Sequence, residues 1–315
     1  MVSFSDIESA YKVLRPVVHK TPLLSSRTFN ENSGNEVYFK AENFQRIGAF
    51  KFRGAYNKIA SLTAEQRRAG VIAHSSGNHA QGVALACKLF NVKAIIVMPR
   101  DSVQLKVDAA RAYGAEIVFC GNTTDDRERT TGELIAKSGY TLVHPFNDET
   151  LIAGQGTAAL ELVQDVRELD YLFVPVGGGG LIAGCSIAAK NLFPNVKVIG
   201  VETEGANDCY QSFRAKKLVK LKSVNTIADG IRTLSVGELN FEIILRFVDD
   251  VITIKDDDIL PMMKFFLQRM KIVVEPTGAV APAAVMKNSG GLKGKKICAI
   301  ISGGNADPEI LRKTI

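Results

Sequence analysis

Residues 172–184 read LFVPVGGGGLIAG and set four successive glycines between two apolar segments. The run Leu172–Val176 has the length of a buried β-strand, and the segment that begins at Leu181 is typical of a buried helix. Residues without a Cβ let the backbone approach a ligand closely, and a helix start offers unpaired N–H groups and the positive end of its dipole. The stretch therefore predicts a strand, an anion-binding loop and a helix; a tight structural turn is the plainer alternative.

The same order of strand and helix recurs on both sides of this loop. The predicted strands are Val71–His74, Ala94–Met98, Ile117–Phe119, Leu172–Val176, Val196–Val201 and Ile297–Ile301. The predicted helices are Gln81–Phe90, Val103–Tyr113, Thr150–Val163, Leu181–Asn191, Asp256–Met270 and Ala279–Lys287. This alternation predicts an α/β fold with parallel sheets covered on both faces, in which ligands bind at the carboxyl ends of the strands.

Composition is that of an ordinary globular protein. The chain has 315 residues, of which 46% are hydrophobic and 23% charged. This length and hydrophobic content are enough to form the core of one large domain or of two closely joined ones. Its net charge of +6 comes without a basic run interleaved with aromatic residues, so we expect no nucleic-acid partner. Five scattered cysteines and an amino terminus without a long apolar stretch predict a reduced, cytoplasmic protein with no membrane partner.

The glycine loop also satisfies a dinucleotide-binding pattern. Gly178, Gly180 and Ala183 fit Gly-x-Gly-x-x-Gly/Ala, and Glu202 ends the next predicted strand at about the distance expected of a ribose-binding acid. From this segment alone, an NAD-dependent dehydrogenase stays open as an alternative.

Two further polar loops follow predicted strands. One consists of residues 302–305, which read SGGN. The other leads into a predicted helix and consists of His74, Ser75, Ser76, Gly77, Asn78 and His79. Their Ser and Asn side chains could simply cap helices and turns, but three such loops after three buried strands favour a role in binding a carboxylate or phosphate.

Lys51 lies between Phe50 and Phe52. Most lysines are solvated surface charges. An apolar setting would instead lower the pKa of the amine and make it available for a Schiff base. These residues alone leave both interpretations open.

Taken together, the segments resemble pyridoxal-5'-phosphate (PLP) enzymes of fold type II, and within them the serine racemase and serine/threonine dehydratase family. The other matching segments are 21–23 (TPL), 50–55 (FKFRGA), 152–157 (IAGQGT), 228–230 (ADG) and 275–277 (EPT). The resemblance covers nearly the whole chain. It implies a tryptophan synthase β-like fold with a large PLP-binding domain (residues 1–68 and 148–315), a small domain (residues 69–147) and the active site in the cleft between them.

The resemblance assigns site residues one by one. Lys51 would carry the cofactor as a Schiff base, Asn78 would contact its ring oxygen and Ser302 its pyridine nitrogen. The implied cofactor-binding set is Phe50, Lys51, Asn78, Gly177, Gly178, Gly179, Gly180, Gly230 and Ser302. The implied substrate-binding set is Ser75, Ser76, Gly77, Asn78 and His79. With the glycines on the cofactor phosphate, the dinucleotide interpretation is displaced.

The activity implied is the conversion of L-serine or L-threonine to pyruvate or 2-oxobutanoate and ammonia, with Lys51 removing the Cα proton. Ser76 matches the serine that faces the lysine across the cofactor in serine racemases, so racemisation of serine at the same site is implied as well. A threo-3-hydroxyaspartate ammonia-lyase is the nearest alternative, because that substrate needs only one more cationic contact. A non-catalytic PLP carrier is a third.

A cation site is also implied. Glu202, Ala206 and Asp208 match the divalent-cation site of serine racemases, where two carboxylates and one backbone carbonyl hold Mg²⁺ or a similar ion. Without the resemblance, these residues would be interpreted as a solvated acidic loop.

Subfamily features point in different directions. Phe146 replaces an asparagine that contacts the cofactor in mammalian racemases, and is more like the threonine dehydratases and fungal racemases. Gln81 and Tyr113 match nucleotide-contacting positions of ATP-activated racemases, whereas Arg46 and Ile47 do not, so ATP is only weakly implied as an effector. The chain ends shortly after the 302–305 loop, so we expect no regulatory domain and no feedback inhibition by isoleucine. The family also implies a homodimer.

Overall fold

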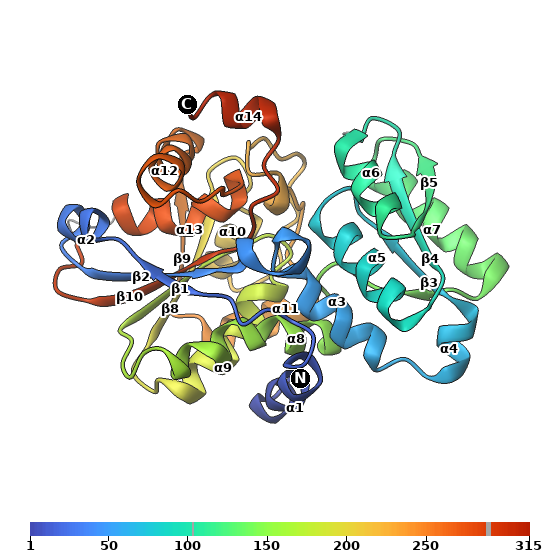
Figure 1. Cartoon of the computed structure of the whole chain (residues 1–315), viewed down its shortest axis with the longest axis horizontal. Helices are drawn as coiled ribbons and strands as arrows, with labels where there is room; N and C mark the ends of the chain where they lie inside the picture. The colour runs from blue at the N-terminus through green and yellow to red at the C-terminus, as the bar shows by residue number, and fades with distance from the viewer. Residues whose placement is uncertain (103, 288–290) are drawn as a thin grey trace.

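Two β-sheets flanked by helices organise the chain in the computed structural model, which describes residues 1–102, 104–287 and 291–315 (Figure 1). Over these residues, one sheet has six strands in the order β1-β2-β10-β7-β8-β9, and the other has four in the order β5-β4-β3-β6. Neighbouring strands are parallel except β1 and β2, which are antiparallel. The predicted α/β fold with two parallel-sheet domains is confirmed.

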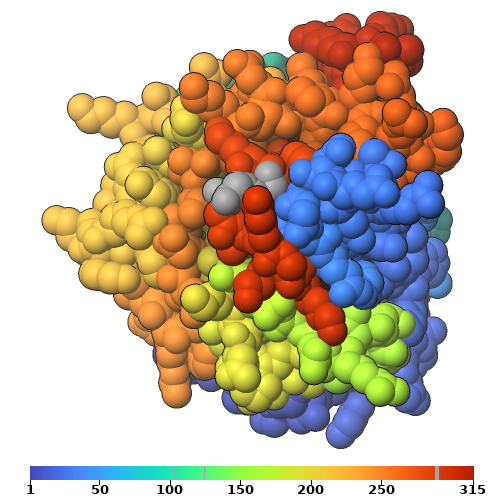
Figure 2. Space-filling view, turned by 90° about the vertical axis from the view of Figure 1, so that its left-hand side faces the viewer, coloured from blue at the N-terminus to red at the C-terminus, as the bar shows by residue number. Residues whose placement is uncertain are grey.

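The larger sheet joins the two ends of the chain. Its strands are β1 (Leu23–Ser25), β2 (Glu36–Ala41), β7 (Tyr171–Pro175), β8 (Lys197–Thr203), β9 (Asp250–Ile254) and β10 (Lys296–Ile301). Because β10 pairs with β2, carboxy-terminal and amino-terminal segments lie side by side, as the red and blue surfaces in Figure 2 show.

Helices cover both faces of this sheet. One face carries α1 (Phe4–Leu14), α8 (Glu149–Leu160), α9 (Gly180–Leu192) and α11 (Glu238–Phe247). The other carries α2 (Arg27–Ser33), α12 (Ile259–Phe265) and α13 (Pro276–Lys287). Successive strand residues point to opposite faces, so Leu172 and Val174 belong to the first core and Phe173 to the second.

The smaller sheet consists of β3 (Val71–His74), β4 (Ala94–Pro99), β5 (Glu116–Cys120) and β6 (Thr141–Leu142). One face packs against α3 (Lys51–Ala60), α5 (Asn78–Phe90) and α6 (Gln104–Ala112), and the other against α7 (Thr124–Ser138). The division of the chain at residues 69 and 147 stays a prediction. Short helices complete the fold at α4 (Ala64–Ala69), α10 (Asp208–Ala215) and α14 (Pro308–Arg312).

A buried ionic cluster ties α3 to the larger sheet. The Arg53 guanidinium donates to Glu42 at 2.7 and 2.9 Å and to Glu161 at 2.8 and 3.0 Å, and Lys40 donates to Glu161 and to the backbone of Thr21. All four charged side chains are buried. Two cations facing two carboxylates leave the cluster without net charge, which is how such groups can be kept away from water.

All six predicted strands are present, with ends that agree to within two residues. The predicted helix at Asp256–Met270 is divided into a 3₁₀ turn, α12 and a final π-helical turn at Phe266–Met270. Val103, the predicted start of α6, lies outside the described residues. Nowhere in the described part of the chain does a helix combine the length and hydropathy needed to cross a bilayer.

Candidate active site

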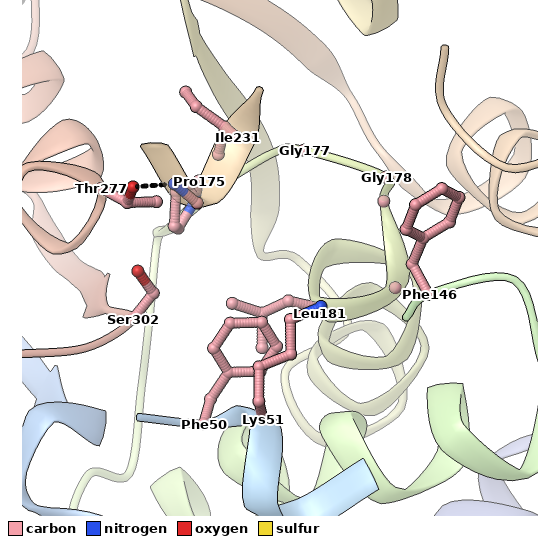
Figure 3. A pocket seen from close by; sticks show the side chains of 13 residues that line it. Phe50, Lys51, Phe146, Pro175, Gly177, Gly178, Leu181, Ile231, Thr277 and Ser302 are labelled. Atoms are coloured by element: carbon pink, nitrogen blue, oxygen red, sulfur yellow. Dashed lines mark hydrogen bonds between the residues drawn. The ribbon is translucent and has the colours of Figure 1, made fainter. Parts of the chain in front are cut away.

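A pocket lies at the carboxyl ends of β7 and β10, where the glycine loop, the 302–305 loop and the start of α3 meet (Figure 3). All of the predicted cofactor residues except Asn78 line it. Phe146 also lines it, as do four residues that the sequence analysis did not assign: Pro175, Leu181, Ile231 and Thr277. Thr277 accepts a hydrogen bond from the Gly230 N–H at 2.9 Å and so holds one wall.

Lys51 is the first residue of α3 and points into this pocket (Figure 3). Its Nζ donates to the Pro145 carbonyl at 2.7 Å and lies 5.2 Å from the centre of the Phe50 ring. The side chain is partly accessible to solvent, but the amine itself is buried, and burial lowers its pKa to about 8. Lys51 is therefore a partly neutral amine at physiological pH and not a solvated surface charge.

The four glycines form a cradle that side chains would fill. A Cβ on Gly178 would overlap the Phe146 ring, and Gly179, at φ +90°, would bring a Cβ to 2.7 Å from Val236. Asn240 fixes the loop by donating to the Gly178 carbonyl at 2.6 Å. Because Gly180 begins the 13-residue helix α9, the cradle ends at unpaired N–H groups, which suits a phosphate.

Ser302 carries an orphaned hydroxyl at the opposite side of the pocket. Its side chain is buried, and among the described residues Oγ has no hydrogen-bond partner. A buried hydroxyl without a partner is costly, so this atom is suited to meet a polar ligand atom such as a ring nitrogen. The glycine cradle, Lys51 and Ser302 together fit the shape and chemistry of PLP.

The loop 75–77 links β3 to α5, and Ser75 Oγ accepts from the Gly77 N–H at 3.2 Å. Asn78 begins α5 and does not line the pocket directly; its amide contacts Glu275 and Asn305, each at 2.8 Å. His79 is buried with Nε2 2.9 Å from the Val143 carbonyl, so its ring is engaged in the interior of the smaller sheet's domain. Only its backbone N–H could join a carboxylate cradle.

Two polar residues beside the pocket were missed by the sequence analysis. His144 Nδ1 accepts from the N–H groups of Phe146 and Asn147, and burial lowers its pKa to about 4, so the ring is neutral. Glu275 is buried, and burial followed by the charge of Asp229 raises its pKa to about 8. The only sequence signal for Glu275 was its place in the 275–277 segment, and the only one for His144 was its position two residues before Phe146.

The residues of the predicted cation site do lie together. Glu202, near the end of β8, accepts from the N–H groups of Cys209 and Tyr210, and Asp208 begins α10 close by. Both carboxylates are buried, so the interpretation as a solvated acidic loop is wrong. Burial and the charge of Asp208 raise the pKa of Glu202 well above its usual range, and burial raises that of Asp208 to about 7.

Ala206, in the loop between β8 and α10, forms an isolated bridge to Thr203, the last residue of β8. Within the described residues, neither carboxylate oxygen of Asp208 makes a hydrogen bond, and no group of three or more His, Cys, Asp or Glu side chains is placed to hold a metal. An ion at this point would need backbone or water oxygens besides the two carboxylates, as the predicted set with the Ala206 carbonyl provides.

Known proteins resemble the chain over nearly its full length. A family model described as pyridoxal-phosphate dependent enzyme matches residues 14–303. The L-threo-3-hydroxyaspartate ammonia-lyase of Saccharomyces cerevisiae is 48% identical over 97% of this chain and 94% of its own length. The L-threonine ammonia-lyase of Thermotoga maritima is 44% identical over 100% of this chain and 78% of its own. The crystal structure of serine racemase from Dictyostelium discoideum superposes with a TM-score of 0.92 at 45% identity, covering 97% of this chain and 99% of that one.

The lowered pKa of Lys51 predicts a pH profile for cofactor uptake. Only the neutral amine can attack an aldehyde, so protein stripped of PLP should rebind it at a rate that rises about tenfold per pH unit and levels off above pH 8. Stopped-flow absorbance measures this rate, and borohydride reduction with peptide mass spectrometry locates the label. Lys58, which lies in the same helix and is paired with Asp148, should stay unlabelled. A rate that still climbs at pH 10 would contradict the depressed pKa.

Proposed function

Because the chain belongs to the family of pyridoxal-phosphate-dependent enzymes, we propose that it converts L-serine to pyruvate and L-threonine to 2-oxobutanoate, each with release of ammonia. The same site is proposed to racemise serine. One observation carries the proposal: a lysine amine with a pKa near 8 shares a pocket with a glycine cradle and an orphaned hydroxyl. Family membership removes the NAD-dependent alternative.

Bound PLP would supply a conjugated ring that withdraws electrons from the substrate Cα and so makes its proton removable. Lys51 Nζ, whose lowered pKa leaves a fraction of the amine neutral at cellular pH, is the base for that proton, and the Pro145 carbonyl orients it. The residues 177–180 would hold the phosphate. The neutral Ser302 hydroxyl would face the pyridine nitrogen without a full charge, which suits elimination better than chemistry that needs a strongly protonated ring.

The substrate carboxylate is proposed to sit on the loop formed by Ser75, Ser76, Gly77, Asn78 and His79. This loop opens α5, a 13-residue helix whose first N–H groups are free to bind an anion. The helix that this loop opens packs against the start of α3, since a Cβ on Gly82 in α5 would come 3.2 Å from the Lys51 backbone carbonyl. Carboxylate on one side and base on the other would present the Cα proton to Lys51.

A substrate panel tests this function. Pyruvate, 2-oxobutanoate, oxaloacetate and D-serine should be measured with one preparation given L-serine, L-threonine and threo-3-hydroxyaspartate. We expect the first two products and D-serine, and no turnover in Lys51→Ala. Oxaloacetate as the dominant product would instead favour the hydroxyaspartate ammonia-lyase, for which the 48% identical yeast protein is the supporting observation. Turnover of none of the three substrates would leave only a PLP carrier.

Ser76 should separate the two proposed activities. If it donates and accepts the proton on the face opposite Lys51, Ser76→Ala should keep most elimination from L-serine while losing racemisation and activity on D-serine. Chiral chromatography and pyruvate release measure the two. Ser102→Ala, which alters a hydroxyl after the neighbouring strand β4, is the matched control. Equal losses on L- and D-serine would overturn the two-face assignment.

We further propose that Glu202, Asp208 and the Ala206 carbonyl bind Mg²⁺ or a similar divalent cation. Two buried carboxylates repel each other, and a cation would relieve the repulsion. Saturating Mg²⁺ should then stabilise the protein by about 2–3 kcal/mol and raise its Tm by several degrees. Asp208→Asn should abolish the shift, whereas Glu204→Gln, at an exposed position of the same loop, should keep it. Identical melting in excess chelator and in Mg²⁺ would exclude the site.

Three further proposals rest on the family: a homodimer, a large domain of residues 1–68 and 148–315, and a small domain of residues 69–147. A location in the cytoplasm is proposed from the scattered cysteines and the amino terminus without a long apolar stretch. ATP binding at Gln81 and Tyr113 has weaker support, since Gln81 is buried within α5.

A further inference from the structure

The turn that leads into the Lys51 helix is strained. Ile47 has φ +60° and ψ +8°, and Gly48 follows at φ +71°. The left-handed region is uncommon for any residue with a Cβ and a genuine outlier for a β-branched one. Such a conformation persists only where the surrounding structure holds it, so the contacts around Ile47 bear directly on where Lys51 sits.

The loop 302–305 supplies those contacts. The Asn305 side-chain amide donates to the Ile47 carbonyl at 2.7 Å. Backbone hydrogen bonds run from the Gly304 N–H to the Gly48 carbonyl at 2.9 Å and from the Phe50 N–H to the Ser302 carbonyl at 3.1 Å. The strained turn is thereby fastened to the loop that also carries the Ser302 hydroxyl.

The same amide reaches the other side of the site. Asn305 Nδ2 also donates to Asn78 Oδ1 at 2.8 Å, which uses both of its hydrogens, and Asn78 Nδ2 donates to Glu275 Oε1 at 2.8 Å. The Ile47 carbonyl fixes the orientation of the side-chain amides of Asn305 and Asn78, because a carbonyl can only accept and Asn305 must therefore turn its NH₂ group toward it. Asn78 must therefore turn its oxygen to Asn305 and its nitrogen to Glu275. One further N–H of Asn78 is left for a ligand.

We propose that Asn305 is a positioning residue, which locks the strained Ile47 turn before Lys51 to the orientation of the Asn78 amide. The inference rests on the proposed function, in which Lys51 carries the cofactor, and on the contact of Asn78 with the cofactor's ring oxygen that the family resemblance implies. Three segments distant in sequence, around residues 47, 78 and 305, are joined by this one side chain.

Two substitutions distinguish positioning from packing. Asn305→Asp keeps the side-chain volume but replaces the NH₂ group, which donates two hydrogen bonds, by a carboxylate oxygen, which can only accept. That oxygen would face the Ile47 carbonyl, which is also an acceptor. The Asn78 amide would have to rotate so that its NH₂ group points to residue 305. Asn305→Ala removes the donors without reversing Asn78. Positioning therefore makes Asp the more damaging change, whereas a packing role would make Ala the worse one.

The holoprotein variants should be compared in kcat and KM for L-serine, in the absorption spectrum of the bound cofactor and in Tm. We expect kcat to fall about 10²-fold in Asn305→Asp, as for a misplacement of about 1 Å, with a smaller fall in Asn305→Ala. KM should change little, and the cofactor band should shift.

The matched control is Asn35→Asp, remote from the pocket. Asn35 is buried whereas Asn305 is partly buried, but its Nδ2 likewise donates twice, to the carbonyls of Ser33 at 2.8 Å and Leu292 at 2.7 Å. Asn35→Asp should lower Tm about as much as Asn305→Asp does, but it should leave kcat and the absorption spectrum of the cofactor unchanged. Asn305→Asp with a kcat like that of Asn35→Asp, or milder than Asn305→Ala, would overturn the proposal.

A double-mutant cycle with Ile47→Gly tests the strain itself. Glycine accepts the left-handed conformation, so the turn no longer needs holding, and Asn305→Ala should reduce kcat several-fold less in that background. If the fold losses in kcat of Asn305→Ala and Ile47→Gly multiply in the double variant, the two residues are not coupled and the proposal is contradicted. Failure of the wild type to show borohydride-fixed PLP on Lys51 or turnover would instead refute the proposed function, so the two failures are distinguishable.

Discussion

Enclosure of the Arg53 guanidinium between Glu42 and Glu161 is the constraint on which the site depends. Arg53 lies two residues beyond Lys51 in α3, a helix that packs against the smaller sheet. Its partners lie after β2 and after α8, in elements of the larger one. Because a buried charge cannot be left without its counter-ion, this cluster fixes the start of α3 relative to the larger sheet. The Lys51 amine is thereby placed in the same pocket as the glycine cradle.

Parallel strands complete the arrangement, since every loop after a carboxyl end opens toward the same region. The strands with continuous apolar runs could be predicted, as for Leu172–Val176 and Ile297–Ile301. β2 could not, because its Lys40 looks like a surface charge, and the carboxylate that neutralises it in the interior belongs to Glu161, 121 positions away in the chain. Helix α7 was missed for a related reason: it is largely polar and shows no regular apolar stripe.

For the candidate site, the glycine run itself indicated an anion-binding loop, whereas Lys51 and Ser302 were assigned only through the resemblance that their short motifs carry. The neutral state of His144 and the raised pKa of Glu275 come from burial by segments remote in sequence, which no local pattern encodes. The orientation of Asn78 depends on Asn305 in the same way. Residue identity could thus be read from the sequence, whereas protonation and orientation required the folded chain.

The alternation of Leu172, Phe173 and Val174 between two cores has a consequence for how the larger sheet comes apart. Each central strand contributes side chains to both hydrophobic cores. Removing the helices from one face would therefore expose apolar side chains to water, while the helices on the other face still pack against the same strands. Neither layer can loosen alone at low cost. The helices on the two faces, though the sheet lies between them, should therefore melt as one cooperative unit.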